Sequence, residues 1–273
     1  MEIRSQMNTV YALLKPDNFL QNTLFQSVDI LQKYGYNIID YKIIRVSDEL
    51  SAKMYAEDFN PTLDFYTFNK RLFHLAPAVA MILNTDTEQE IFARQKGAAI
   101  PLWITDTSKL RYQMGAQSRL FNRIHIPQTT QQATTEQLLT FGIYPKYDKT
   151  LKHLKSEVQK CGYMNVLPAP DKLWEHVQWR VIYALPSYSP KNILRPLSSF
   201  HKKQVSMWTT MASLTPDPIF QHIIEIIINF SENHKKRLLY QLDYLWTCLA
   251  LKHIFVSDIE KYHLTAYFIY PTN

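Results

Sequence analysis

Short apolar runs and amphipathic segments alternate along the N-terminal half of the chain. Thr9–Leu14 and Ala78–Leu83 are continuous β-branched and apolar stretches of strand length, and Tyr36–Val46 has the composition of a further strand. Between the predicted strands Thr9–Leu14 and Tyr36–Val46, the segment Asn22–Tyr34 places apolar residues at intervals near 3.6, which predicts a helix that Gly35 ends. This order of strands and helices predicts mixed α and β structure.

The rest of this half continues the pattern. Ser47 before two acidic residues predicts another helix start, and a helical stretch runs through Leu63–Leu75. A helix after Asp86 is followed by an irregular segment at Gly97–Arg111, a short strand near Leu120–Ile124 and a closing helix at Thr129–Phe141. The element order predicts an α+β fold of the ferredoxin-like kind, with helices on an antiparallel sheet.

The pattern changes near Gly142–Lys149, where glycine, proline and mixed charge are typical of an exposed connection. We therefore predict two domains, residues 1–144 and residues 145–273, the second mainly α-helical. Prolines divide this second part, and helix starts are predicted at Asp217-Pro218 and at Ser231. The segment Leu264–Tyr270 fits either a strand or an aromatic tail.

Composition excludes several classes of site. Five glycines are too few and too scattered for a glycine-rich phosphate loop, so side chains must hold any nucleotide. No two of the nine histidines lie three to five positions apart, which excludes local zinc-ligand spacing. Neither an apolar leader nor a membrane-spanning run is present, so we expect a protein of the cytoplasm without a membrane partner.

The net charge of +6 belongs to the second domain. From Pro145 onward, 16 Lys and Arg face 10 Asp and Glu, whereas the preceding residues carry 14 of each. An excess of this size over such a length fits an ordinary solvated surface, so nucleic acid is not the expected partner.

Six polar residues of the first half form an ordered set. The turn that begins at Lys15 follows the first strand, Arg111 lies seventeen positions after Arg94, and Glu136 lies eleven after His125. Together with Asn122, and with the apolar segment Ala76–Met81, this set resembles the nucleoside diphosphate kinase family over about residues 9–141.

The resemblance implies a role for each residue. His125 would carry the phosphoryl group, Glu136 would accept the other imidazole N–H, and Lys15, Arg94 and Arg111 would contact phosphate oxygens. Asn122 would bind the ribose, and two aromatic residues are implied as well: Phe65 would stack on the base, and Tyr55 would be the active-site tyrosine. The family also implies Mg²⁺, held through the nucleotide phosphates and by no protein ligand.

Several features depart from the family pattern or fit a structural role. The family's Gly-Ser-Asp after the histidine is replaced here by Ile126-Pro127-Gln128, and proline removes a backbone donor. Ala98, Ala99 and Ile100 occupy the region of the family's phosphate-contacting threonine. Taken singly, His125 also fits a structural histidine, Arg94 a helix C-terminal cation, and Phe65 a core aromatic.

The implied function is a transferase, an ATP-binding kinase that moves the terminal phosphate of a nucleoside triphosphate to a nucleoside diphosphate through phosphohistidine. Two alternatives stay open: a nucleotide-binding relative that acts as a sensor or interaction protein, and a transferase with a non-nucleotide acceptor. A homo-oligomer, and a protein partner or second substrate for the C-terminal domain, also stay open.

Overall fold

The computed structural model describes residues 8–55, 70, 72–98, 106–117, 121–143, 149–160, 167–168, 170–184, 216–232, 239–257, 260–261 and 263–265. The chain divides into two compact units, Met1–Leu167 and Pro168–Asn273. The domain boundary predicted at residue 144 stays a prediction, since residues 144–148 lie outside the described ranges.

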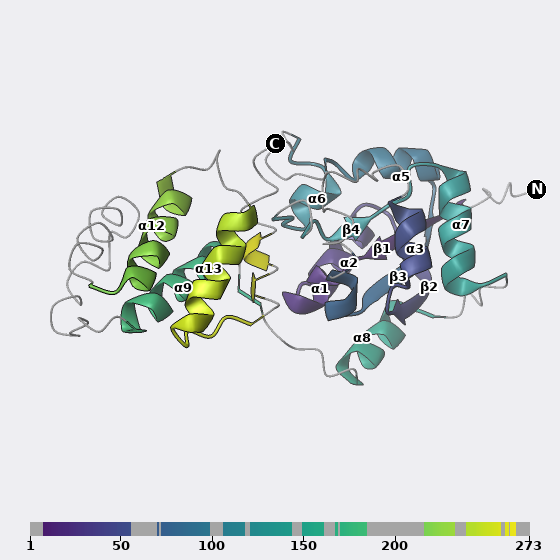
Figure 1. Ribbon diagram of the computed structural model, residues 1–273. Coiled ribbons are helices and arrows are strands. Elements are labelled where there is room, and N and C mark those ends of the chain that lie inside the picture. Colours follow the sequence, from purple (N-terminus) through teal and green to yellow (C-terminus); the bar gives the residue numbers. More distant parts are fainter. Residues whose placement is uncertain are drawn as a thin grey trace, which may run out of the picture. The chain divides into compact units, whose positions relative to one another are not determined.

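A four-stranded antiparallel sheet lies in the first unit (Figure 1). Its strands are β1 (Asn8–Leu14), β2 (Asn37–Ile44), β3 (Ala78–Thr85) and β4 (Ile124–His125), in the sheet order β2-β3-β1-β4. This order, with helices between β1 and β2 and between β3 and β4, is the ferredoxin-like arrangement. The predicted α+β fold is confirmed.

The two central strands are apolar on both faces because both faces are covered. Every side chain from Val10 to Leu14 and from Ala78 to Leu83 is at most 2% exposed. The continuous apolar runs in the sequence therefore reflect burial on both sides rather than an alternation of inner and outer positions. They form the core on which the functional side chains are mounted.

Besides the helical residues 70 and 72–75, the first unit contains the helices α1 (Asp17–Leu20), α2 (Leu24–Lys33), α3 (Asp48–Met54), α5 (Gln89–Gln95), α6 (Leu110–Gln113), α7 (Thr130–Phe141) and α8 (Leu151–Lys160). The predicted caps are present, since the Ser47 hydroxyl accepts from Leu50 N at 3.1 Å and Gly35 ends α2 with φ 85°. Helices α5 and α7 both contact β1, and α3 contacts α7 (Figure 1). The last strand and α7 thus lie beside the same central strand.

One strand is shorter than predicted. The strand expected at Leu120–Ile124 begins only at Ile124, because Arg123 has φ 69°, a left-handed conformation that no strand accommodates. Residues 118–120 lie outside the described ranges, as does most of the helix predicted at Leu63–Leu75, of which residues 72–75 are helical.

The second unit contains α9 (Pro170–Ala184), α12 (Pro218–Glu232) and α13 (Leu239–Leu251), so its mainly helical character is confirmed for the described residues. Asp217 caps α12 as predicted, and its Oδ1 accepts from Ile219 N at 2.9 Å. The helix start predicted at Ser231 is wrong, because α12 runs through this residue and ends at Glu232. Of the segment Leu264–Tyr270, residues 264 and 265 are helical and the rest lies outside the described ranges.

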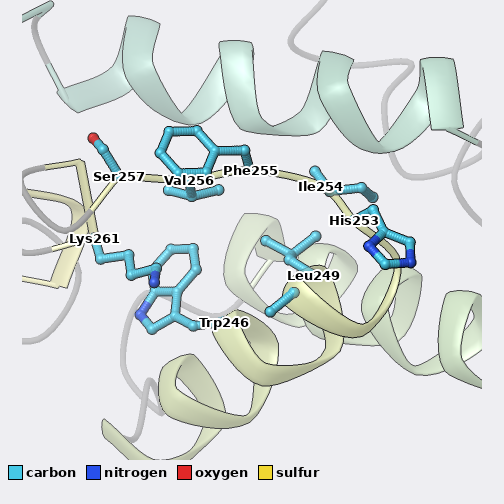
Figure 2. A pocket seen from close by; sticks show the side chains of 9 residues that line it. Trp246, Leu249, His253, Ile254, Phe255, Val256, Ser257 and Lys261 are labelled. Atoms are coloured by element: carbon cyan, nitrogen blue, oxygen red, sulfur yellow. The ribbon is translucent and has the colours of Figure 1, made fainter.

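A cavity of about 430 Å³ lies beside α13 and the segment that follows it (Figure 2). Its lining includes the apolar residues Trp246, Leu249, Phe255 and Val256, and Lys261 supplies a cation. In the parts of the chain that are described, no helix is long and apolar enough to cross a membrane.

Candidate functional site

His125, the last residue of β4, and Glu136 of α7 form a buried pair. The His125 Nε2 lies 3.0 and 2.9 Å from the two carboxylate oxygens of Glu136, which is fully buried, and His125 is 7% exposed. A carboxylate only accepts hydrogen bonds, so this contact assigns the proton to Nε2 and leaves the lone pair on Nδ1. The pair therefore leaves one ring nitrogen with a free lone pair and holds the other as a donor.

The surroundings keep this imidazole neutral. Burial lowers the pKa of His125 below its usual 6.5, and the charges of Lys96 and Arg111 lower it further, whereas Glu136 raises it. The net direction is downward, so at pH 7 the Nδ1 lone pair is available.

Lys15 lies directly after β1 and is 1% exposed. Burial lowers its pKa from 10.5 to about 7; the carboxylate of Asp17 opposes this shift and the charge of Arg111 adds to it. Its backbone N–H donates to Arg123 O at 2.9 Å, which joins the turn to the segment before His125. An anion at this point would stabilise the charged form of the ammonium group.

Arg111 and Lys96 are two further buried cations, each 7% exposed. The Arg111 guanidinium donates to Gly97 O and Ile124 O, both at 3.2 Å. The Lys96 Nζ donates to Ile126 O at 2.7 Å, directly beyond the histidine. Both cations donate to backbone carbonyl groups, and an anionic ligand bound near them would gain favourable charge interactions.

Asp17 and Arg123 form a separate buried ion pair with a structural role. Their charged atoms lie 3.8 Å apart, and the Arg123 backbone N–H donates to Asp17 Oδ2 at 2.9 Å. Asn18 reinforces the connection, because its side-chain amide donates to Lys15 O at 3.0 Å and to Arg123 O at 2.7 Å. These contacts fix the strained Arg123 backbone and, with it, the approach to His125.

The structure brings most of the predicted residues together. The Tyr55 ring centroid lies 5.8 Å from that of His125, and Asn122 is buried in the segment just before β4. Arg94 instead lies on the exposed side of α5, where its charge acts on Glu90. Phe65 lies outside the described residues.

Sequence reasoning did not identify Lys96, Gln89, Gln132 or Arg123 at the site. Gln132 had a detectable signal, because it precedes Glu136 by four positions and therefore shares its helix face. The sequence gives no comparable signal for Lys96 and Gln89, because they lie near the histidine only through the packing of α5 beside β1.

The described residues offer no protein-held metal site: no cluster of three or more His, Cys, Asp or Glu side chains occurs among them. The buried carboxylates of Glu136 and Asp17 are already paired, with His125 and with Arg123 respectively. These residues fit a divalent cation only if phosphate oxygens of a nucleotide hold it.

A sequence model of the nucleoside diphosphate kinase family matches residues 8–143. Residues 8–143 form a domain of the nucleoside diphosphate kinase family. The match contains the whole sheet, α7 and every site residue described above, while the helices of the second unit lie beyond it.

Individual relatives of this kinase-family domain are distant. A nucleoside diphosphate kinase of Desulforamulus reducens is 27% identical over 101 residues, which cover 35% of this chain and 63% of the relative. One of Thermococcus kodakarensis is 24% identical over 158 residues, 55% of this chain and 84% of the relative. Among solved structures, the enzyme of Aquifex aeolicus matches with TM-score 0.42 and 18% identity, over 48% of this chain and 92% of its own. The nucleoside diphosphate kinase of Encephalitozoon cuniculi matches with TM-score 0.44 and 16% identity, over 56% of this chain and 99% of its own.

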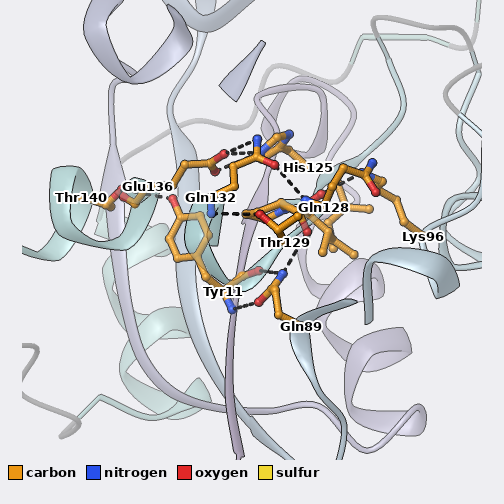
Figure 3. Close-up of polar contacts among 12 residues, drawn as sticks. Tyr11, Gln89, Lys96, His125, Gln128, Thr129, Gln132, Glu136 and Thr140 are labelled. Carbon is orange, nitrogen blue, oxygen red and sulfur yellow. Dashed lines mark hydrogen bonds and ion pairs between the residues drawn. The ribbon is translucent and has the colours of Figure 1, made fainter. Parts of the chain in front are cut away.

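The segment that departs from the family pattern is firmly held. Besides the Lys96 contact to Ile126 O, Pro127 O accepts from Gln89 Nε2 at 3.2 Å, and Gln128 N donates to Gln132 Oε1 at 2.9 Å (Figure 3). Gln89 also bonds the backbone of Tyr11 in β1. The side chains of Lys96, Gln89 and Gln132 thus restrain the backbone around Pro127, which itself has no N–H to donate.

Proposed function

We propose that this protein is a phosphotransferase that moves the terminal phosphate of a nucleoside triphosphate to a nucleoside diphosphate through a phosphohistidine at His125. The observation that carries the proposal is the pairing of His125 Nε2 with the buried Glu136 carboxylate, beside three buried cations. Membership of residues 8–143 in the nucleoside diphosphate kinase family supports it.

The proposed reaction has two halves. The Nδ1 lone pair attacks the γ-phosphorus, and the N–P bond forms as the bond to the β–γ bridging oxygen breaks, so the nucleoside diphosphate leaves with that electron pair. A β-phosphate oxygen of a second nucleoside diphosphate then attacks the phosphohistidine, and the N–P electrons return to Nδ1. The proton on Nε2 remains donated to Glu136 throughout.

The buried cations have the chemistry for the charge of the transferring group. Lys15 and Arg111 would contact phosphate oxygens, with Asn122 toward the ribose and Phe65 toward the base. Mg²⁺, bound through the nucleotide phosphates, would add positive charge there when present. Nucleoside di- and triphosphates are the proposed partners, and a homo-oligomer stays a prediction.

A labelling experiment tests the proposal. The full chain is incubated with γ-labelled ATP and Mg²⁺, and acid-labile label on the protein is measured, followed by a chase with GDP. We expect label that His125→Ala abolishes and that GDP recovers as GTP. Label stable to GDP would point to another acceptor, and nucleotide binding without label would point to a sensor or interaction protein; either outcome contradicts the proposal.

Lys96 is expected to serve as a phosphate-binding cation where Arg94 does not. Lys96→Gln should weaken nucleoside diphosphate binding about tenfold or more, since a charged hydrogen bond contributes roughly 1.5–3 kcal/mol. Arg94→Gln is the matched control, because Arg94 lies on the same helix end but is exposed, and its affinity should stay within twofold of wild type. Isothermal titration calorimetry measures both, and an equal loss in the two variants would exclude this role for Lys96.

A further inference from the structure

Gln132 connects two parts of the site, the segment that follows His125 and the buried Glu136 carboxylate. Its Oε1 accepts from the backbone N–H of Gln128 at 2.9 Å, and its Nε2 donates to Glu136 Oε1 at 3.0 Å (Figure 3). One side chain therefore contacts both the turn that follows His125 and the residue that holds the imidazole.

The two bonds fix the orientation of the amide. Because Gln128 N–H can only donate, the oxygen of Gln132 must face it, and the NH₂ group must then face the carboxylate. The Glu136 carboxylate consequently accepts from the His125 ring and from Gln132, while its own backbone carbonyl accepts from the Thr140 hydroxyl at 2.6 Å. A buried carboxylate needs such donors to remain charged and oriented.

Pro127 explains why a side chain has this position. Proline has no N–H, so the first backbone donor after Ile126 is that of Gln128, and it is consumed by Gln132 rather than directed at the histidine. The Thr129 hydroxyl caps α7 by accepting from Gln132 N at 3.2 Å, which sets Gln132 in the first turn of the helix, one turn before Glu136.

We propose that Gln132 is the positioning residue of this site, holding the Glu136 carboxylate in line with His125 Nε2 and tying it to the turn that contains Pro127. It touches no reacting atom and acts through Glu136. The inference rests on the proposed function for its kinetic consequence, but its structural consequence, the tautomer of His125, does not depend on turnover.

Three variants test it in the full chain. Gln132→Met removes both bonds at similar length, and Gln132→Glu keeps an acceptor for Gln128 N–H but, when ionised, has no proton to donate to Glu136. Gln131→Met is the matched control, because Gln131 is the exposed neighbour on the same helix. Thermal unfolding of each variant establishes that it is folded.

Gln132→Met and Gln132→Glu should both slow label transfer to His125 by roughly tenfold to a hundredfold, the usual effect of removing such a supporting contact, with nucleotide affinity unchanged. In ¹⁵N-histidine NMR spectra, both should raise the fraction of His125 protonated at Nδ1, whereas Gln131→Met should match wild type. If wild type takes no label but the tautomer shifts as stated, the proposed function fails and the positioning role stands. The inference would be overturned if Gln132→Met kept the wild-type tautomer of His125 and, where label forms, the wild-type labelling rate. A wild-type tautomer in Gln132→Glu would overturn the donation from Gln132 to Glu136.

Discussion

Glu136→Gln is expected to lower the rate of phosphoryl transfer to His125 by about 10³–10⁴-fold while leaving nucleotide affinity nearly unchanged. An amide in place of the carboxylate can donate to Nε2, and the imidazole would then carry its proton on Nδ1, the nitrogen that must attack. In a serine protease, the equivalent change at the residue that orients the histidine costs about 10⁴-fold for this reason. Single-turnover labelling measures the rate.

Glu88→Gln is the control for this substitution. Glu88 is exposed at the start of α5 and makes no side-chain capping hydrogen bond, so its variant should label at the wild-type rate. ¹⁵N-histidine NMR spectra of Glu136→Gln should show the Nδ1–H tautomer. A Glu136→Gln protein that labels within tenfold of wild type would show that the carboxylate does not set the tautomer during transfer.

Lys15 is expected to make nucleotide binding depend on pH between about 7 and 9. Its pKa is about 7 in the empty site, and a bound polyphosphate stabilises the charged form and raises that pKa. Below pH 7 the lysine is already protonated and affinity should be level. Above pH 7 binding must bring a proton with it, so the affinity should fall up to tenfold for each pH unit.

The substitution that isolates this effect is Lys15→Met. It removes the titrating charge, so affinity should be weaker by about a hundredfold at pH 6.5, equivalent to the removal of a strong charged contact, and this slope with pH should disappear. Asp17 and Arg111, whose charges act on Lys15, are unchanged in this variant. Calorimetry in buffers of different ionisation enthalpy measures the proton uptake directly. A wild-type affinity that stays constant from pH 6.5 to 9 would contradict the prediction.

The local sequence pattern predicted the strands and most of the helices. The prediction failed where contacts between residues remote in sequence determine the backbone. The run Thr9–Leu14 could only be a buried strand, and Ser47 and Gly35 supplied cap chemistry that operates within one turn. The strand at Leu120–Ile124 was predicted too long because the left-handed backbone of Arg123 is supported by Asp17, more than a hundred positions away. The sequence around Arg123 gives no indication of its hydrogen bond to Asp17.

The residues of the candidate site were likewise predictable from the sequence only in part. His125, Glu136, Lys15 and Arg111 were found in sequence because their order and spacing resemble one family, and the structure places them around one buried imidazole. Arg94 was selected by the same spacing, yet it lies exposed while Lys96, two positions later, is buried beside Ile126. A helix turns about 100° per residue, so a shift of two positions moves a side chain to another face, and spacing alone does not determine which face meets the site.

The sequence by itself indicated most of the secondary-structure order, the family resemblance of about residues 9–141 and the identity of the histidine and its carboxylate, because each depends on local periodicity or on residue types at fixed intervals. Only the tertiary structure decided which nitrogen of His125 is held, whether Arg94 or Lys96 faces inward, and how Gln89 and Gln132 restrain the segment around Pro127. These depend on hydrogen bonds between elements that are remote in sequence, and their directions exist only once α5, α7 and β1 have packed together.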